Sequence, residues 1–242
     1  MGDKNLNELL KWSIENSTRA DDTTESTNAP RSTLTPELMA ALMGGPSDAE
    51  LMVASMQAIQ SDDPEISLSS KVTAFDNLEQ LIESLDNANL LSKLGLWTPL
   101  LECLAHPEAE IRKMAAWCTG TAVQNNEPCQ ERLVAHGGVE RLVRMTIGHR
   151  LPPAAADSAT KDGGEEYDAG SGEETSEVRR KAIYALSSAV RNYQPAMDAC
   201  AAELRRRGHT DLVGEDHKSI DASNMDDVDA VISGLKAKVP SS

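Results

Sequence analysis

The amino-acid sequence predicts an all-α protein built from repeated helical units, with a flexible N-terminal segment and an acidic insertion. Three observations lead to this prediction. Hydrophobic residues make up 40% of the 242 residues, yet the chain has only three Trp, three Tyr and one Phe. Such a composition favours helices over sheets, because strands favour β-branched and aromatic side chains. Apolar residues also recur at helical spacing, and one helical segment returns later in the chain.

The returning segment is IRKMAAWCTGTAVQNN at residues 111–126, where apolar residues share one helical face. Its pattern comes back 67 positions later as VRRKAIYALSSAVRNYQP at residues 178–195. The matched pairs are Arg112 and Arg179, Ala115 and Ala182, Trp117 and Tyr184, Asn125 and Asn192, and Pro128 and Pro195. Small residues such as Gly120 predict that a neighbouring helix approaches closely. An internal repeat of this kind indicates a helical repeat protein.

A second spacing defines the repeating unit. Residues 91–101 (LSKLGLWTPLL) lie 42 positions before residues 133–143 (LVAHGGVERLV), so that leucines coincide and Gly95 matches Gly137. A unit of about 42 residues, with a short helix, a glycine-hinged second helix and a longer third helix, is typical of armadillo repeats. Such units bury their apolar faces only against their neighbours. We therefore expect a short armadillo-like solenoid of two to three repeats.

The N-terminal region divides into a segment and a linker. Residues 1–17 contain an amphipathic helical pattern, followed at residues 18–34 by a polar stretch without periodicity, which predicts a flexible tether. The apolar residues of the segment are Leu6, Leu9, Leu10, Trp12 and Ile14. So short a helix is marginal on its own in water. The segment therefore docks on the body, captures a partner or is an inert tail.

Residues 35–242 form the expected helical domain, beginning with a helix at Thr35. Further helices are predicted at residues 47–60, 68–85, 90–94 and 97–104, with a corner at residues 86–89, then at 111–126, 133–143, 178–195, 196–207 and 225–238. Residues 148–177 are rich in Pro, Gly, Ser and acidic side chains. They therefore predict a disordered acidic insertion. Residues 208–242 are expected to be a tail that caps the solenoid.

Charge and motif content exclude several functions. The net charge of −16 argues against binding to nucleic acid or to anionic membranes, which require clustered Lys and Arg, and no apolar run approaches the roughly 18 residues of a membrane span. The histidines and cysteines lack metal-binding spacing, and no catalytic motif is present. We expect a monomer of the cytosol or the nucleus that binds a partner, with reduced structural thiols, no metal, no cofactor and no catalytic residues.

Four stretches, in order along the chain, carry a resemblance to one family. They are LLKWSIENS at residues 9–17, AFDNLEQLIESLDNANLLSKLGLWTPLLECL at 74–104, AAWCTGTAVQNN at 115–126 and RRKAIYALSSAVRNYQPAMDA at 179–199. Together they resemble the armadillo-type nucleotide exchange factors of heat-shock protein 70 chaperones, most closely the fungal cytosolic branch. Longer relatives carry about four repeats, whereas two full units and one partial unit are readable here.

The resemblance implies a cochaperone. The armadillo body would bind the nucleotide-binding domain of heat-shock protein 70 and promote ADP release, which leads to client release. The N-terminal segment would occupy the peptide-binding domain of the chaperone and help to expel clients. Its implied client-release residues are Leu6, Leu9, Leu10, Trp12 and Ile14.

The resemblance also suggests contact residues for the chaperone. The candidates are Asp86, Asn87, Ala88, Asn89, Gln124, Asn125, Asn126, Arg191 and Asn192. Ala88 falls where a small residue would allow close approach, and the others lie at a corner or at the ends of the long helices. Asparagine at a helix end is often only a cap, so contact and cap both stay open. Trp117 and Tyr184 could face a groove or belong to the core.

An armadillo adaptor that binds an extended peptide in its groove is the alternative function. Nuclear import receptors of this type line the groove with regularly placed Trp and Asn over many repeats. Here the array is short, and Trp117 is matched by Tyr184 rather than by a second Trp. The sequence LLKWSIENS has no use in a groove adaptor, which favours the cochaperone.

Overall fold

The structure is a computed structural model, and the residues that it describes are 45–152, 172–214 and 220–240. The chain divides into two compact units, Met1–Ser47 and Asp48–Ser242. All described helices belong to the second unit. The predicted segment at residues 1–17, the linker at 18–34 and the helix expected from Thr35 lie outside the described residues.

Helices joined by short turns make up the described part of the second unit. In chain order they are α3 (Asp48–Gln60), α4 (Leu68–Ile82), α5 (Leu85–Lys93), α6 (Trp97–Glu102), α7 (Ala109–Val123), α8 (Glu127–Ala135), α9 (Gly138–Thr146), α10 (Ser176–Val190), α11 (Gln194–Arg206), α12 (Thr210–Val213) and α13 (Met225–Ala237). Hydroxyl caps start two of the long helices. Ser67 Oγ accepts a hydrogen bond from the amide of Ser70 at the start of α4, and Thr175 Oγ1 accepts one from the amide of Val178 at the start of α10.

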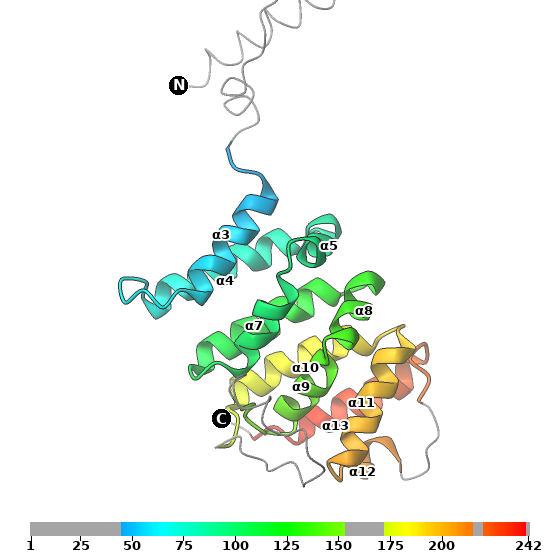
Figure 1. Cartoon of the computed structure of the whole chain (residues 1–242). Helices are drawn as coiled ribbons and strands as arrows, with labels where there is room; N and C mark the ends of the chain where they lie inside the picture. The colour runs from blue at the N-terminus through cyan, green and yellow to red at the C-terminus, as the bar shows by residue number, and fades with distance from the viewer. Residues whose placement is uncertain (1–44, 153–171, 215–219, 241–242) are drawn as a thin grey trace, which may run out of the picture. The chain divides into compact units, whose positions relative to one another are not determined.

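These helices form repeated three-helix units. One unit comprises α5, α6 and α7, the next α8, α9 and α10, and a third α11, α12 and α13. The third helices of these units, α7, α10 and α13, pack beside one another in order. Helix α4, which precedes the first unit, packs on α7, so that α4, α7, α10 and α13 form a stack (Figure 1). The prediction of an all-α helical repeat is confirmed. As in other solenoids, each unit buries its apolar side against a neighbouring unit.

Close approach of α7 and α10 depends on a small residue, as the sequence predicts. A Cβ atom added at Gly120 would lie 2.6 Å from the ring of Tyr184 and 2.9 Å from the Cα of Ala185. Any side chain at this position would therefore push the two helices apart. The apolar residues of both helices point into one continuous core, which includes Ile111 and Leu186.

The third unit differs from the expected capping tail at residues 208–242. Here α12 and α13 complete a unit that α11 begins, and α13 packs on α10. A repeated glycine turn supports this assignment: Gly95, Gly137 and Gly208 end the first helices of the three units with φ of 68°, 65° and 78°. The left-handed conformation suits glycine and closes a helix through a Schellman-type turn. Sequence comparison missed this unit because its helices share few residue types with the others.

The predicted corner at residues 86–89 is wrong. Helix α4 ends at Ile82 and α5 begins at Leu85, so the turn lies at residues 83–84, before the expected corner. The Ser84 carbonyl accepts a hydrogen bond from the amide of Ala88 at 2.9 Å. Ser84 is therefore the N-cap residue of α5. Asp86 lies in the first turn of α5, where a carboxylate interacts favourably with the helix dipole.

The expected insertion at residues 148–177 has ordered ends. His149 and Glu173 form an antiparallel bridge, and the amide of Glu174 donates to the carbonyl of Gly148 at 2.8 Å. Helix α10 already begins at Ser176. The acidic composition misled the prediction at this end, because the carboxylate of Glu174 is buried against an arginine rather than solvated.

Candidate partner-binding face

Polar and aromatic side chains line the exposed sides of α7 and α10, which we call the third-helix face. On α7 and just beyond it these residues are Glu110, Lys113, Trp117, Thr121 and Gln124. On α10 and just beyond it they are Glu177, Lys181, Tyr184, Ser188 and Arg191. A spacing of three or four residues places each set along one side of its helix. Because α7 and α10 lie side by side, the two sets make one surface.

An aromatic and cationic group lies at the centre of the third-helix face. The Nζ of Lys181 lies 3.7 Å from the centre of the Trp117 ring and 5.8 Å from that of Tyr184. Burial lowers the pKa of the Lys181 ammonium. A cation held over an aromatic face is stabilised by the ring quadrupole. Half-buried Trp and Tyr side chains of this kind are enriched where proteins bind one another.

A hollow of about 440 Å³ lies beside this group, between α4, α7 and α10. Two hydrogen bonds brace its wall: Thr121 Oγ1 donates to Glu79 at 2.8 Å, and the Tyr184 hydroxyl donates to Gln124 at 3.3 Å. Leu85, which is 54% exposed, lies at its rim. We call it the α4–α7 hollow. Its carboxylates and its exposed leucine offer a mixed polar and apolar contact.

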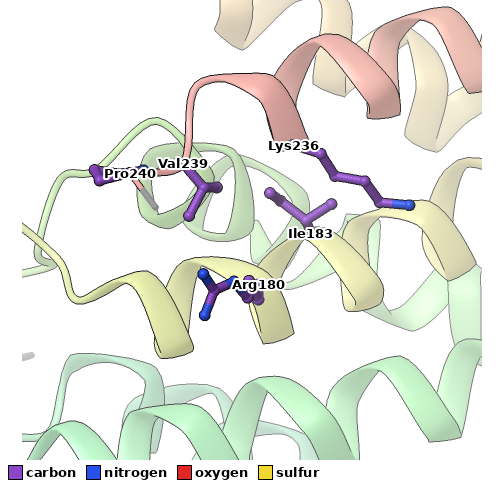
Figure 2. Close-up of a pocket in the computed structure, with 5 residues that line it drawn as sticks. All are labelled: Arg180, Ile183, Lys236, Val239 and Pro240. Carbon is purple, nitrogen blue, oxygen red and sulfur yellow. The ribbon is translucent and has the colours of Figure 1, made fainter. Parts of the chain in front are cut away.

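A second hollow lies at the other end of the stack, between α10 and α13. Figure 2 shows Arg180 and Ile183 on α10 and Lys236 on α13, with Val239 and Pro240 in the chain that follows α13. This α10–α13 hollow measures about 370 Å³. The stack therefore has acidic residues in the hollow at its α4 end and basic residues in the hollow at its α13 end. A partner that covers both hollows would need the opposite arrangement of charge.

The described residues contain neither a metal-binding cluster nor a membrane-spanning helix. In residues 45–152, 172–214 and 220–240, no cluster of three or more His, Cys, Asp or Glu side chains is arranged to hold a metal ion. Within the part of the chain that the structure describes, no helix combines the length and the apolar character that a membrane crossing needs. The side chains of the third-helix face can bind a partner of complementary shape and charge.

Known proteins are similar over nearly the whole chain. The family model for "Nucleotide exchange factor Fes1" matches residues 6–91. The Hsp70 nucleotide exchange factor FES1 of Gibberella zeae is 56% identical over 243 residues, which cover 99% of each protein. The corresponding protein of Neurospora crassa is 46% identical over 268 residues, again 99% of each. That of Coccidioides immitis is 45% identical over 238 residues, 97% of this chain and 98% of the relative.

This chain belongs to the Fes1 family. The resemblance drawn from its sequence is therefore confirmed, and so is the match to fungal relatives. The predicted contact residues can now be placed on a Fes1-family structure.

The first group of predicted contacts is largely structural in this Fes1-family chain. Ala88 is 1% exposed, and its carbonyl accepts a hydrogen bond from Cys129 Sγ at 3.4 Å. Its small side chain packs in the core, and a chaperone contact at Ala88 stays a prediction. Asn87 donates to Asp48 at 2.8 Å and to the Leu81 carbonyl at 3.0 Å. Asn89 accepts a weak bond from Cys129, and Asp86 is exposed on α5.

The second group lies at the ends of α7 and α10. Asn125 and Asn192 both have left-handed backbones, with φ of 52° and 55°, so each ends its helix as a cap would. Asn126 is 4% exposed and starts α8. Gln124 and Asn125 nevertheless line the α4–α7 hollow. The cap and contact interpretations are therefore compatible at Asn125, and both stay predictions.

Arg191 connects two repeats. Its guanidinium donates to Ser187 on α10 at 3.2 Å and to Met225 on α13 at 3.2 Å, and it forms an ion pair with Asp229. The side chain thus holds the α10–α13 contact, which sequence inspection could not foresee because α13 was not recognised as a third helix. The client-release candidates Leu6, Leu9, Leu10, Trp12 and Ile14 lie outside the described residues.

Sequence reasoning missed the group around Lys181. The signal was the matched aromatic pair Trp117 and Tyr184. Aromatic residues of repeat helices lie more often in the core than at a groove, so the core was the preferred interpretation. Both are half-buried at the surface instead. Glu79 and Thr121 were also missed, because their pairing joins residues 42 positions apart on adjacent repeats.

Proposed function

We propose that this chain is a nucleotide exchange factor that binds the nucleotide-binding domain of Hsp70, promotes ADP release and so leads to client release. One observation carries this proposal: the chain is 56% identical, over 99% of both proteins, to a protein named Hsp70 nucleotide exchange factor. Two further relatives with the same designation cover at least 97% of this chain. The cytosol is the compartment that we propose for this activity.

Exchange by this route needs binding energy and no catalytic side chain. A partner shifts a conformational equilibrium only by binding one state better than another. The chain would bind Hsp70 more tightly when the nucleotide cleft of Hsp70 is open than when that cleft is closed. ADP would then leave faster, and ATP would take its place and release the client.

The third-helix face is the surface that we assign to Hsp70. It combines two hollows with an aromatic group around Lys181, and interface energy usually concentrates in a few such anchors. Trp117 and Tyr184 supply apolar area, while Lys181 and the flanking carboxylates supply orientation. Gln124, Asn125, Arg191 and Asn192 lie at the edge of this face and remain proposed contacts, whereas Ala88 is buried where α5 meets α8.

Release of a fluorescent ADP analogue from purified cytosolic Hsp70 tests the proposal. The full chain is expected to accelerate release in a saturable way. The double variant Lys181→Glu, Tyr184→Ala should need at least about tenfold more protein for half-maximal acceleration, because two anchors are lost. Glu102→Lys, an exposed charge reversal on α6, should behave as the wild type.

The same assay distinguishes exchange activity from the alternative function, a groove adaptor. No acceleration at saturating protein would contradict exchange activity and favour an adaptor that binds an extended peptide. If the double variant and Glu102→Lys lost the acceleration equally, the exchange activity of the wild type would still stand. The third-helix face would then be rejected as its site.

The segment at residues 1–17 has a separate proposed role in expelling clients from the peptide-binding domain. Deleting it should leave ADP release unchanged while slowing the release of a labelled client peptide. Replacing Leu9 and Trp12 by Ser in the full chain should have the same effect on client release. Unchanged client release in both variants would reject this role.

A further inference from the structure

A third pocket lies away from the third-helix face, where the ends of α5 and α8 meet the start of α6. The structure gives it a volume of about 360 Å³. Lys93, from the last residue of α5, contributes one wall, and Arg132 and His136, from the end of α8, contribute another. Helices α5 and α8 contact each other directly, as Figure 1 also indicates. We call this site the α5–α8 pocket.

The α5–α8 pocket gathers basic side chains that lack partners. Among the described residues, Lys93, Arg132 and His136 form no side-chain hydrogen bond or ion pair. This is unexpected in a chain with 39 acidic residues against 23 Lys and Arg. Elsewhere in the described ranges basic residues do find carboxylates, as Lys113 and Lys238 do.

Helix dipoles explain part of this arrangement. A cation near a helix C-terminus is favourable by a few tenths of a kcal/mol to about 1 kcal/mol, and Lys93 and Arg132 each occupy the last turn of a helix. That effect acts on each helix separately. It does not account for the convergence of the two helix ends on one hollow, nor for the absence of any carboxylate from its lining.

A buried donor lies in the wall of the same pocket. Trp97 is 2% exposed, and its indole Nε1 has no acceptor among the described residues. Buried indole N–H groups usually have a partner. Within the described part of the chain, the wall of the pocket therefore contains an unpaired buried donor in addition to the unpaired cations Lys93 and Arg132.

We propose that the α5–α8 pocket binds the phosphate group of a phosphomonoester. Lysine offers three N–H donors and arginine five, and the hydroxyl groups of Ser92 and Thr98 also line the pocket. Donors on several sides suit a tetrahedral dianion better than a planar carboxylate. The volume exceeds that of one phosphate group, and Leu91 gives part of the lining an apolar surface for the organic part of the ester. The ester is either a small molecule or a phosphorylated side chain.

Indole N–H signals in a ¹H–¹⁵N spectrum of the full chain provide a direct test. The chain has Trp12, Trp97 and Trp117, and the variant Trp97→Phe assigns the relevant signal. We expect the Trp97 signal to shift in a saturable way on titration with inorganic phosphate, glycerol 3-phosphate or a phosphoserine tripeptide, while the Trp117 signal stays in place. The unphosphorylated tripeptide should cause no shift.

Surface variants connect the signal to the pocket. The double variant Lys93→Gln, Arg132→Gln should weaken phosphate-ester binding about tenfold or more, because charge-assisted hydrogen bonds are lost. Lys71→Gln on α4 removes one positive charge elsewhere and should leave binding unchanged. Both variants should unfold within a few degrees of the wild type, because the helix-dipole interactions lost in the double variant are worth at most about 1 kcal/mol each.

The outcomes distinguish the sources and decide the proposal. Tighter binding of the tripeptide supports a phosphorylated protein, and equal or tighter binding of glycerol 3-phosphate supports a small ester. No saturable shift, equal binding of citrate, or equal affinity in the double variant would overturn the proposal. None of these measurements contains Hsp70, so their result is independent of the exchange assay.

Discussion

Arg112 and Arg179, equivalent residues of α7 and α10, are buried and hold the chain around them. Arg112 donates to the Glu174 carboxylate through two nitrogens, each at 2.7 Å, and to the carbonyls of His106 and Pro107, each at 2.8 Å. Arg179 donates to the carbonyl of Thr146 at 3.1 Å. Each arginine thus fixes the segment that precedes a third helix. The repeated arginine seen in the sequence has a structural role.

The ion pair of Arg112 with Glu174 gives the first prediction on stability. Its side chains are 3% and 0% exposed, so Glu174→Gln would leave a buried guanidinium without its counter-charge. Breaking a buried pair from one side costs about 3–5 kcal/mol. Urea unfolding should show a loss of about 3 kcal/mol. Glu177→Gln, which removes an exposed partner of Lys113, should change the stability by less than about 0.5 kcal/mol. Equal effects in the two variants would contradict this role for the buried pair.

The four cysteines should be unreactive in the folded chain. All are buried and free. Burial raises the pKa of Cys103, Cys129 and Cys200 from 9.0 to about 12 and raises that of Cys118 well above 9.0. Because the thiolate is the reactive form, labelling by iodoacetamide at pH 8 should be at least about a hundredfold slower than after unfolding in urea. Rapid labelling of any cysteine in the folded chain would refute this expectation.

At the scale of elements, the insertion is closed at its base. The bridge between His149 and Glu173 and the bond from Glu174 to Gly148 hold its two ends together. The fold of α9 and α10 therefore depends on these ends and not on the length of the chain between them. The cost of closing a loop rises by only about 0.6 kcal/mol for each doubling of its length.

A shortened loop tests this independence. Replacing residues 153–171 by four Gly and Ser residues should change the free energy of unfolding by less than about 1 kcal/mol, because the remaining ends already meet. Extending the deletion through residue 174 removes the partner of Arg112 and should cost about 3 kcal/mol more. Urea unfolding of the two variants makes the comparison. A large loss in the shorter deletion would show that the replaced residues contribute to the core.

The sequence predicted some elements well because their signals are local. Helices α7 and α10 follow from apolar spacing and from their mutual match, and the contact at Gly120 follows from residue size. The turn before α5 was misplaced, since asparagine favours both turns and helix starts. Glu174 was assigned to the insertion because composition does not reveal a partner 62 residues away.

At the scale of the whole molecule, the candidate face arises from stacking, which sequence alone describes only in part. The repeat spacing was enough to predict three-helix units that bury their apolar faces against their neighbours. It was not enough to predict that Lys181 would lie over Trp117 across two repeats, or that Ala88 would be inside. These depend on the rotation of each helix in the stack, which packing decides.

The stack also predicts that α13 is required for folding. It buries Val228, Val231, Ile232 and Leu235, and burial of such a side chain is worth about 1.5–3 kcal/mol. Arg179 also donates to the Lys238 carbonyl at 2.8 Å. The loss of four buried side chains is comparable with the whole stability of a typical domain, about 5–15 kcal/mol.

A chain that ends at Gly214 should therefore fail to unfold cooperatively, whereas the removal of a mere terminal cap would leave most of the stability in place. Point variants give a graded test in the full chain. Leu235→Ala should cost about 2–5 kcal/mol, and Ser233→Ala, at an exposed position of the same helix, should change the stability by less than about 0.5 kcal/mol. Urea unfolding monitored by circular dichroism provides the values. If the truncated chain kept the midpoint and slope of the full chain, α13 would be a dispensable tail and the third unit would not be part of the cooperative fold.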